Sequence, residues 1–288
     1  MTAVTRLGLT LLFAGFHIFA PHQSSAADGS ILDQIRETGE ITLGVRRDAR
    51  PHSYIDTEGR PAGYTVEVCN AVAAKLRAQL GLTQLRILHE MVDATDRFQA
   101  VAEGRADLLC GAATITLARR EIVDFTIPTF VDGASVLVRV GASEDFTALD
   151  GERIGVRAGT TTEKALRASL TDFGMEAEVV PVADHAAGLA GVENGALAAY
   201  FGDQSILFAL KESGAAPDRL VVAGNTLTLE LHGLALPLGD HRFRLALDRA
   251  LSQLYREGRM AAIWEQTFPN GDPGESIRYL HTFAPVWP

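Results

Sequence analysis

The stretch Asp107–Phe125, DLLCGAATITLARREIVDF, decides how the rest of the chain is interpreted. It opens with Leu108 and Leu109, an apolar pair typical of a buried strand, and it breaks at Gly111. Small and hydroxylated residues follow, and then Arg119 near the expected start of a helix. Helix N-terminal amides with an arginine one turn further on suit a carboxylate. The stretch therefore predicts a strand end that binds an anion, and a corner with solvated arginines is the alternative.

The length and the N-terminal segment indicate an exported protein with a large core. The chain has 288 residues, of which 47% are hydrophobic, which is enough for more than one domain. Arg6 precedes an apolar run, residues 7–20, and small residues lead up to Ala27. These features are typical of a secretory signal peptide covering residues 1–27, with cleavage near Ala27. The apolar run is short for a membrane span, and we expect no span after it.

The charge balance limits the kinds of partner. Loss of residues 1–27 removes one of the 26 basic residues and none of the 36 acidic ones, which leaves a net charge of −11 with neutral histidines. Such a surface argues against nucleic acid and against anionic membranes as partners. An anionic ligand would therefore need arginines gathered locally around it.

The two cysteines, Cys69 and Cys110, are the only ones in the sequence. In an oxidising compartment an even pair of this kind favours a disulfide. Both lie in apolar segments, so two buried free thiols are the alternative. No histidine pattern accompanies them, and we expect neither a structural metal site nor a cofactor.

Expected strands and helices alternate along the chain, which predicts right-handed βαβ units and mostly parallel sheets. In the first part the expected strands are residues 41–45, 85–89 and 107–110, the expected helices are residues 31–37, 69–80 and 94–102, and residues 63–68 form an alternating segment. In the second part the expected strands are residues 134–140, 153–156, 178–181 and 198–201, and the expected helices are residues 162–173 and 185–194. Two extended segments follow at residues 220–223 and 226–235, then helices at residues 242–255 and 260–268, and then an irregular tail. The similar character of the two halves predicts two similar α/β lobes.

Polar residues follow several of the expected strands. Arg46, Thr114, residues 159–161 and Asp203 all follow an expected strand. In open α/β sheets, ligands bind beyond the carboxyl ends of the strands. We therefore expect these residues to line one binding site.

Several short motifs resemble the family 3 extracellular solute-binding proteins of amino-acid ABC transporters. The motifs are Gly63–Val68 (GYTVEV), residues 104–107 (GRAD), the opening stretch continued to Thr126, residues 159–161 (GTT), Gly202-Asp203 and Leu236-Pro237. The resemblance extends from about Ile31 to Phe268. It implies a type II periplasmic-binding-protein fold, in which two α/β lobes, each a mostly parallel sheet flanked by helices, are joined by a two-strand hinge. Lobe 1 would comprise residues 28–136 and 231–288, and lobe 2 residues 137–230.

The resemblance also implies a role and a set of ligand contacts. Such proteins are periplasmic, act without a cofactor and hand an amino acid to the inner-membrane permease subunits of an importer; we expect a monomer. Arg119 matches the arginine that binds the ligand α-carboxylate, with help from Thr114 and Thr161. Asp203 matches the acid that receives the α-ammonium group. This pairing suits a zwitterion, which needs a fork of donors at one end and a carboxylate at the other.

Within the family the chain is most similar to the glutamate/aspartate-binding members, which implies an acidic amino acid as the ligand. Those members have arginines at the positions of Arg46 and Arg97 and a histidine at the position of His185. Cationic donors of this kind offset the desolvation of a side-chain carboxylate. Each of the three has a structural alternative, since either arginine could face solvent and the histidine could be a polar residue at a helix start. Likewise, Thr161 could simply cap the following helix.

Three alanines depart from the family pattern. Ala94 and Ala112 replace serines of the glutamate/aspartate-binding members, and Ala49 replaces an aromatic ring found in many other members. A different dicarboxylate or a bulkier amino acid is therefore left open.

The alternative function is that of a periplasmic cyclohexadienyl or arogenate dehydratase, which resembles the same family. We favour a binding protein, because no nucleophile–base arrangement is evident. An enzyme also needs a positioned acid, and most acidic residues other than Asp203 lie on expected helices or loops.

Overall fold

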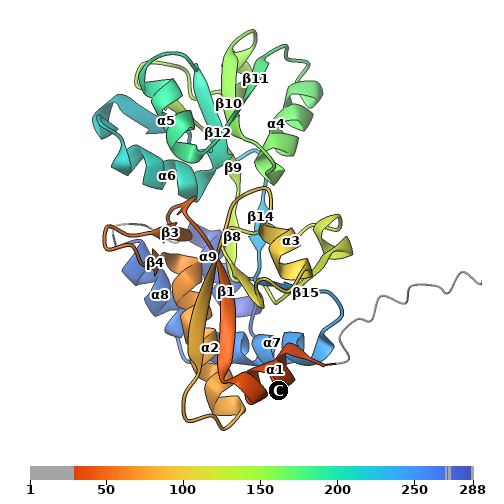
Figure 1. Cartoon of the computed structure of the whole chain (residues 1–288). Coiled ribbons are helices and arrows are strands. Elements are labelled where there is room, and N and C mark those ends of the chain that lie inside the picture. Colours follow the sequence, from red (N-terminus) through yellow and green to blue (C-terminus); the bar gives the residue numbers. More distant parts are fainter. Residues whose placement is uncertain (1–28, 270, 272–273, 287–288) are drawn as a thin grey trace, which may run out of the picture.

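The computed structural model describes residues 29–269, 271 and 274–286. The predicted signal peptide and its cleavage site lie outside this part of the chain. The described chain forms two α/β lobes with a short two-stranded ribbon between them (Figure 1). None of its described helices is both long and apolar enough to cross a membrane.

Lobe 1 is built on a five-stranded sheet with the order β5-β1-β6-β15-β7. Its strands are β1 (Glu40–Arg46), β5 (Arg86–Val92), β6 (Leu108–Cys110), β7 (Val123–Phe125) and β15 (Ala235–Pro237). The first three are parallel, whereas β15 runs antiparallel to β6 and β7. The flanking helices are α1 (Ile31–Thr38), α2 (Tyr64–Gln79), α3 (Arg97–Ala102), α7 (His241–Arg256), α8 (Arg259–Thr267) and α9 (Gly274–Phe283), with the 3-10 turn η1 (Arg119–Glu121). Lobe 1 thus combines the two ends of the described chain (Figure 1).

Lobe 2 repeats this arrangement with the strand order β11-β10-β12-β9-β13. Its strands are β9 (Ala134–Arg139), β10 (Arg153–Arg157), β11 (Glu178–Val182), β12 (Ala199–Asp203) and β13 (Leu220–Val222). Strand β10 runs parallel to β11 and β12, and β9 is antiparallel to β12. The helices are α4 (Thr161–Asp172), α5 (His185–Glu193) and α6 (Gln204–Ser213), with 3-10 turns η2 (Phe146–Leu149) and η3 (Pro217–Arg219).

The ribbon between the lobes consists of β8 (Phe130–Asp132) and β14 (Glu230–His232), which pair antiparallel. Both crossings of the chain between the lobes pass through it. Lobe 1 carries a further small sheet beside the ribbon, formed by β2 (Asp48–Ala49), β3 (Ser53–Ile55) and β4 (Pro61–Ala62). The predicted two-lobed fold with a two-strand hinge is confirmed.

Each lobe has its own apolar core. Tyr64, Phe243 and Leu247 are among the residues buried in lobe 1, and Phe201 and Leu166 are among those buried in lobe 2. The disulfide lies in lobe 1, since Cys69 on α2 is bonded to Cys110 on β6, with 6.1 Å between the Cα atoms. The predicted disulfide is therefore confirmed and the free-thiol alternative is wrong. The bond ties a core helix to the strand that leads to the anion-binding stretch.

Several expected element bounds need correction. Residues 63–68 are not an extended segment, because α2 begins at Tyr64, and Tyr64, Val68 and Val72 bury one helical face at a spacing of four residues. Helix α3 begins at Arg97 rather than Ala94. Helix α6 was not predicted, and the tail contains α9 rather than irregular chain. These two helices each bury only two side chains among the described residues, so their periodic patterns are weak.

Candidate functional site

The carboxyl ends of the parallel strands in the two sheets face each other across the boundary between the lobes. Strand β1 ends at Arg46, β10 at Arg157 and β12 at Asp203, and β6 leads to Thr114. The first residue of α4 is Thr161, that of α5 is His185 and that of α3 is Arg97. The lobes touch here, since a Cβ built at Gly159 of lobe 2 would lie 3.1 Å from the methyl carbon of Thr95 in lobe 1. All seven predicted contact residues are placed at this boundary.

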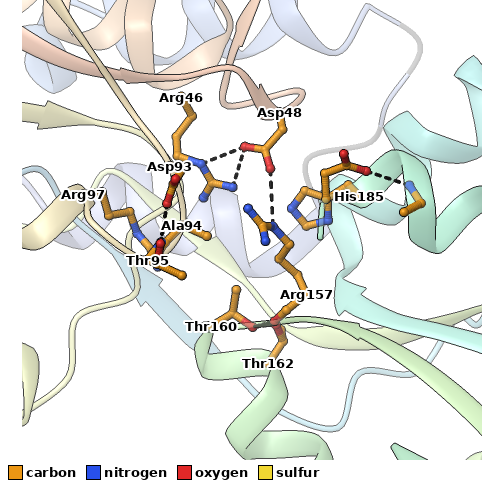
Figure 2. Close-up of polar contacts among 12 residues, drawn as sticks. Arg46, Asp48, Asp93, Ala94, Thr95, Arg97, Arg157, Thr160, Thr162 and His185 are labelled. Carbon is orange, nitrogen blue, oxygen red and sulfur yellow. Dashed lines mark hydrogen bonds and ion pairs between the residues drawn. The ribbon is translucent and has the colours of Figure 1, made fainter. Parts of the chain in front are cut away.

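One group of side chains surrounds Asp48 (Figure 2). The Arg46 Nε and Nη2 atoms donate to Asp48 Oδ1 at 2.9 and 2.6 Å, and Arg157 Nε of lobe 2 lies 3.4 Å from Asp48 Oδ2. Both arginines are buried, so the solvated alternative for Arg46 is wrong. Burial raises the pKa of the Asp48 carboxyl, but the charges of Arg46 and Arg157 outweigh it and hold that pKa below its usual value. The carboxylate is therefore ionised and bridges the lobes.

His185 turns inward beside this group (Figure 2). It is 5% exposed, and its Nδ1 lies 2.7 Å from the Tyr200 hydroxyl oxygen. Burial, and next the Arg46 charge, lower the pKa of His185 to about 3. Asp184, not His185, caps α5, because its Oδ1 accepts a hydrogen bond from the Ala187 amide. His185 is therefore a buried, neutral imidazole at the first position of α5, and it does not cap the helix.

Two hydroxyls converge on a third carboxylate. Thr114 Oγ1 of lobe 1 and Thr161 Oγ1 of lobe 2 lie 3.2 Å apart, and both donate to Glu230 Oε2, at 2.6 and 3.1 Å. Glu230 belongs to the hinge strand β14. The helix α4 is capped by Thr160, whose Oγ1 accepts from the Glu163 amide, so the capping alternative for Thr161 is wrong. The donors predicted for a ligand carboxylate thus hold a carboxylate of the chain itself.

Arg97 and Arg119 differ from the Arg46 group because no carboxylate in the described chain pairs with them. Arg97 is 2% exposed and donates from Nη1 to the Ala94 carbonyl, while its Nε has no partner among the described residues. Arg119 Nη1 donates to the Thr114 carbonyl at 2.6 Å. Both guanidinium carbons lie 4.6 Å from the centroid of the Phe98 ring. The solvent-facing alternative for Arg97 is therefore wrong.

Burial weakens the ionisation of these two arginines. It lowers the pKa of Arg119 to about 10 and the pKa of Arg97 well below its ordinary value, and for Arg97 the charges of Arg46 and Arg119 act in the same direction. An anion placed near them would raise both pKa values again. In the described chain the two arginines therefore lack a paired carboxylate.

Asp203 is the acidic residue that lies near these two arginines. It follows the buried residues Phe201 and Gly202 at the end of β12, and within the described part of the chain its carboxylate has neither a hydrogen bond nor an ion pair. Burial and the charges of Asp132 and Glu230 raise its pKa well above the usual value, although Arg119 and Arg97 oppose the shift. In the described chain this carboxylate is therefore left without a cationic partner.

Sequence reasoning missed Asp48, Arg157 and Glu230. Arg157 follows the expected strand at residues 153–156, so the strand-end rule that selected Arg46 selects it as well. Asp48 and Glu230 carry no such signal, because their roles depend on partners that the fold brings from elsewhere in the chain.

Residues 41–270 match the family described as bacterial extracellular solute-binding proteins, family 3. The chain belongs to this family. It is 31% identical over 248 residues to an L-glutamate/L-aspartate-binding protein of Pseudomonas aeruginosa, covering 85% of this chain and 82% of that protein. It is 26% identical over 277 residues to the glutamate/aspartate import solute-binding protein of Salmonella typhimurium, covering 96% of this chain and 90% of the relative.

Among solved structures, the fold is similar to that of the solute receptor for L-cysteine of Neisseria gonorrhoeae. The TM-score is 0.74 at 23% sequence identity, and the match covers 84% of this chain and 94% of that one. The predicted family is confirmed. Both named relatives are binding proteins rather than enzymes, which agrees with the binding protein expected from the sequence and weakens the dehydratase alternative.

Proposed function

We propose that this family 3 solute-binding protein binds an acidic α-amino acid between its lobes. The observation that supports this most strongly is the arrangement of unpartnered charges. Arg97 and Arg119 have no carboxylate partner among the described residues, and they face the Asp203 carboxylate, which has no cationic partner within ion-pair distance. Anionic and cationic groups of one ligand would satisfy both ends at once.

The unpaired charges of the site favour a ligand with one net negative charge. Among the charged groups that have no ion-pair partner in the described chain, two arginines, Arg97 and Arg119, stand against one carboxylate, that of Asp203. The balance of these unpaired groups is one positive charge when Asp203 is ionised. Glutamate and aspartate each carry two carboxylates and one ammonium group, and so complement that balance.

Each end of the ligand has suitable groups. We assign the α-carboxylate to Arg119, whose planar fork binds carboxylates in a bidentate way, assisted by the hydroxyls of Thr114 and Thr161. The α-ammonium group goes to Asp203. The side-chain carboxylate goes to Arg97 and Arg46, with His185 beside them. This assignment requires Asp48 and Glu230 to share their donors with the ligand.

Contacts with both lobes explain how binding would be signalled. Lobe 1 supplies the arginines and lobe 2 supplies Asp203, so a ligand that touches both favours the closed arrangement. We propose that the closed monomer acts in the periplasm and delivers its ligand to the inner-membrane permease subunits of an ABC importer. The expected signal peptide and the import protein among the relatives support this placement.

The three alanines affect how strictly the ligand is chosen. Ala49, Ala94 and Ala112 are all buried. Their methyl groups offer no hydrogen bond where a serine hydroxyl would offer one, and Ala49 adds space. We therefore propose that related dicarboxylates bind as well, more weakly than glutamate or aspartate.

A thermal-shift screen of refolded, ligand-stripped protein tests the proposal. The panel contains the twenty amino acids, small dicarboxylates and the cyclohexadienyl dehydratase substrates. A ligand that binds the native state raises the melting temperature by mass action. We expect the largest shifts with glutamate and aspartate. Shifts confined to neutral or aromatic compounds would contradict the proposal.

A further inference from the structure

A second polar cluster lies in the hinge, beside the arginine-rich site. It consists of His52, which precedes β3, Asp132 at the end of β8, and His232 at the end of β14. The two histidines are 0% and 2% exposed, and Asp132 is 8% exposed. One ligand-type atom from each residue lies within 4.8 Å of the corresponding atoms of the other two.

Three of the four imidazole nitrogens of this cluster lack partners in the described chain. Within the described chain, neither ring nitrogen of His232 has a hydrogen bond, and Nδ1 of His52 has none. A buried polar atom without a partner destabilises the fold, because the loss of its hydration is not compensated. The surroundings do not compensate, because the His52 ring packs edge-on against Phe130 and Tyr64, with centroids 4.7 and 6.3 Å away. A purely structural role would favour apolar side chains at these positions.

Ser205 connects the cluster to lobe 2. Its hydroxyl lies at the start of α6 and donates to Asp132 Oδ2, while His52 Nε2 lies 2.8 Å from the same hydroxyl oxygen. His52 Nε2 is also 3.6 Å from Asp132 Oδ2. The cluster therefore joins a loop of lobe 1, both hinge strands and the first turn of a lobe 2 helix.

The cluster is reached from a large groove beside the hinge. This groove has a volume of about 1130 Å³, and its lining includes Asp132, Ser205, Phe130 and Arg50. Water and small ions thus have a path to the buried carboxylate.

We propose that His52, Asp132 and His232 form a binding site for a divalent transition-metal ion, with zinc as the best match. Two imidazoles and a carboxylate are a common zinc ligand set, with water or the Ser205 hydroxyl in the fourth position. Ligand atoms of tetrahedral zinc lie about 2.0–2.2 Å from the metal and thus about 3.4 Å from one another, so the three atoms must close by at most about 1.4 Å. Side-chain rotation of the two rings provides this movement.

The three residues are far apart in the sequence, so no local motif predicts this site.

Titration of the tag-free, chelator-treated full mature chain with zinc chloride tests this inference, with calorimetry for affinity and elemental analysis for stoichiometry. We expect one zinc ion per chain. The variants His52→Phe and His232→Phe keep a ring of similar size but remove the ligand nitrogen, and each should weaken zinc binding by at least about tenfold. The exposed His241 provides the matched control, and His241→Gln should bind zinc as the unchanged chain does.

Two further readouts keep the test decisive. One is the melting temperature, which zinc should raise in the unchanged chain and in His241→Gln but not in the two ring variants. The other is the visible absorption of bound Co²⁺ in the unchanged chain, which reports tetrahedral coordination without any variant and so applies even if a variant fails to fold. Absence of saturable zinc binding, or equal zinc affinity in the ring variants, would overturn the proposal. Neither result depends on the amino-acid ligand.

Discussion

The two lobes share a sheet topology but differ in the charges that they bring to the boundary. Lobe 1 supplies Arg46, Arg97 and Arg119 from the ends of its strands and the turns after them. Lobe 2 supplies Asp203. It also supplies Arg157, which forms an ion pair with Asp48 of lobe 1. Under the proposed function, one architecture serves as an anion receptor in lobe 1 and as a cation receptor in lobe 2. We propose that a ligand with both kinds of charge brings the two lobes together.

The lobes also differ in how firmly the receptor is held. In lobe 1 the disulfide anchors β6, the strand before Thr114, to the core helix α2. Arg119 in turn is held by its hydrogen bond to the Thr114 carbonyl. Lobe 2 presents Asp203 at a strand end without a partner among the described residues. We infer that lobe 1 is organised before the ligand arrives, which reduces the entropic cost of binding.

Loss of Arg119 should reduce ligand affinity more than any other substitution described below. Arg119→Ala leaves the ligand α-carboxylate without its main donor, and we expect affinity to fall by about 3–5 kcal/mol, which is near abolition. Calorimetry with glutamate measures the change. The exposed neighbour Arg120 is the control, and Arg120→Ala should bind normally. Retained affinity in Arg119→Ala would remove the anion receptor from lobe 1.

Removal of the disulfide tests the rigidity of lobe 1. The double variant Cys69→Ala, Cys110→Ala opens a covalent link between residues 41 positions apart, and we expect unfolding free energy to fall by about 2–4 kcal/mol. Denaturant unfolding measures this change. Affinity should decrease only slightly, because no ligand contact is removed. An unchanged stability would show that the bond does not hold this lobe.

Substitution of Asp203 should change stability and affinity in opposite directions. Its pKa in the folded, ligand-free chain is raised, so folding is favoured while it is protonated, and this contribution is lost as pH rises from the ordinary carboxyl pKa through the raised one. Asp203→Asn should therefore raise the melting temperature of the ligand-free chain at neutral pH. The same variant should lose about 1–3 kcal/mol of glutamate affinity. Asp172→Asn, at an exposed position, is the control.

The pH dependence of binding follows from the same group. A ligand ammonium needs the ionised carboxylate, so affinity should increase as pH rises through the raised pKa of Asp203, and binding should release protons. Calorimetry in buffers of different ionisation enthalpy counts these protons. In Asp203→Asn the proton release attributed to this group should disappear, and an unaltered release would assign it elsewhere.

Among the substitutions in the site, that of Arg157 should have the smallest effect on ligand affinity. Arg157→Gln removes the contact that joins lobe 2 to Asp48, whose carboxylate keeps both of its hydrogen bonds from Arg46. We expect a loss of about 1 kcal/mol in glutamate affinity, since the closed arrangement is weakened while the main donors remain. An effect as large as that of Arg119→Ala would mean that Arg157 itself contacts the ligand.

The sequence predicts the position of the strand-end residues better than that of their partners. Arg46, Thr114 and Asp203 follow apolar strands, and strand ends of parallel sheets meet at one edge, so a local pattern predicts their position at the lobe boundary. Asp48 and Glu230 were not predicted, because the arginine and threonine side chains that contact these carboxylates come from other elements. The same holds for His52 and His232, which only the hinge brings together. Local periodicity likewise failed for α6, which buries Ile206 and Leu207 and little else.

The central claim is that one net positive charge at the lobe boundary selects an acidic amino acid. Calorimetry with glutamate and glutamine in the same buffer tests it most directly, because the two ligands match in shape and differ in that charge. We predict that glutamate binds at least about 100-fold more tightly, since glutamine leaves the buried Arg97 without a counter-ion. Equal affinities, or tighter binding of glutamine, would contradict the account.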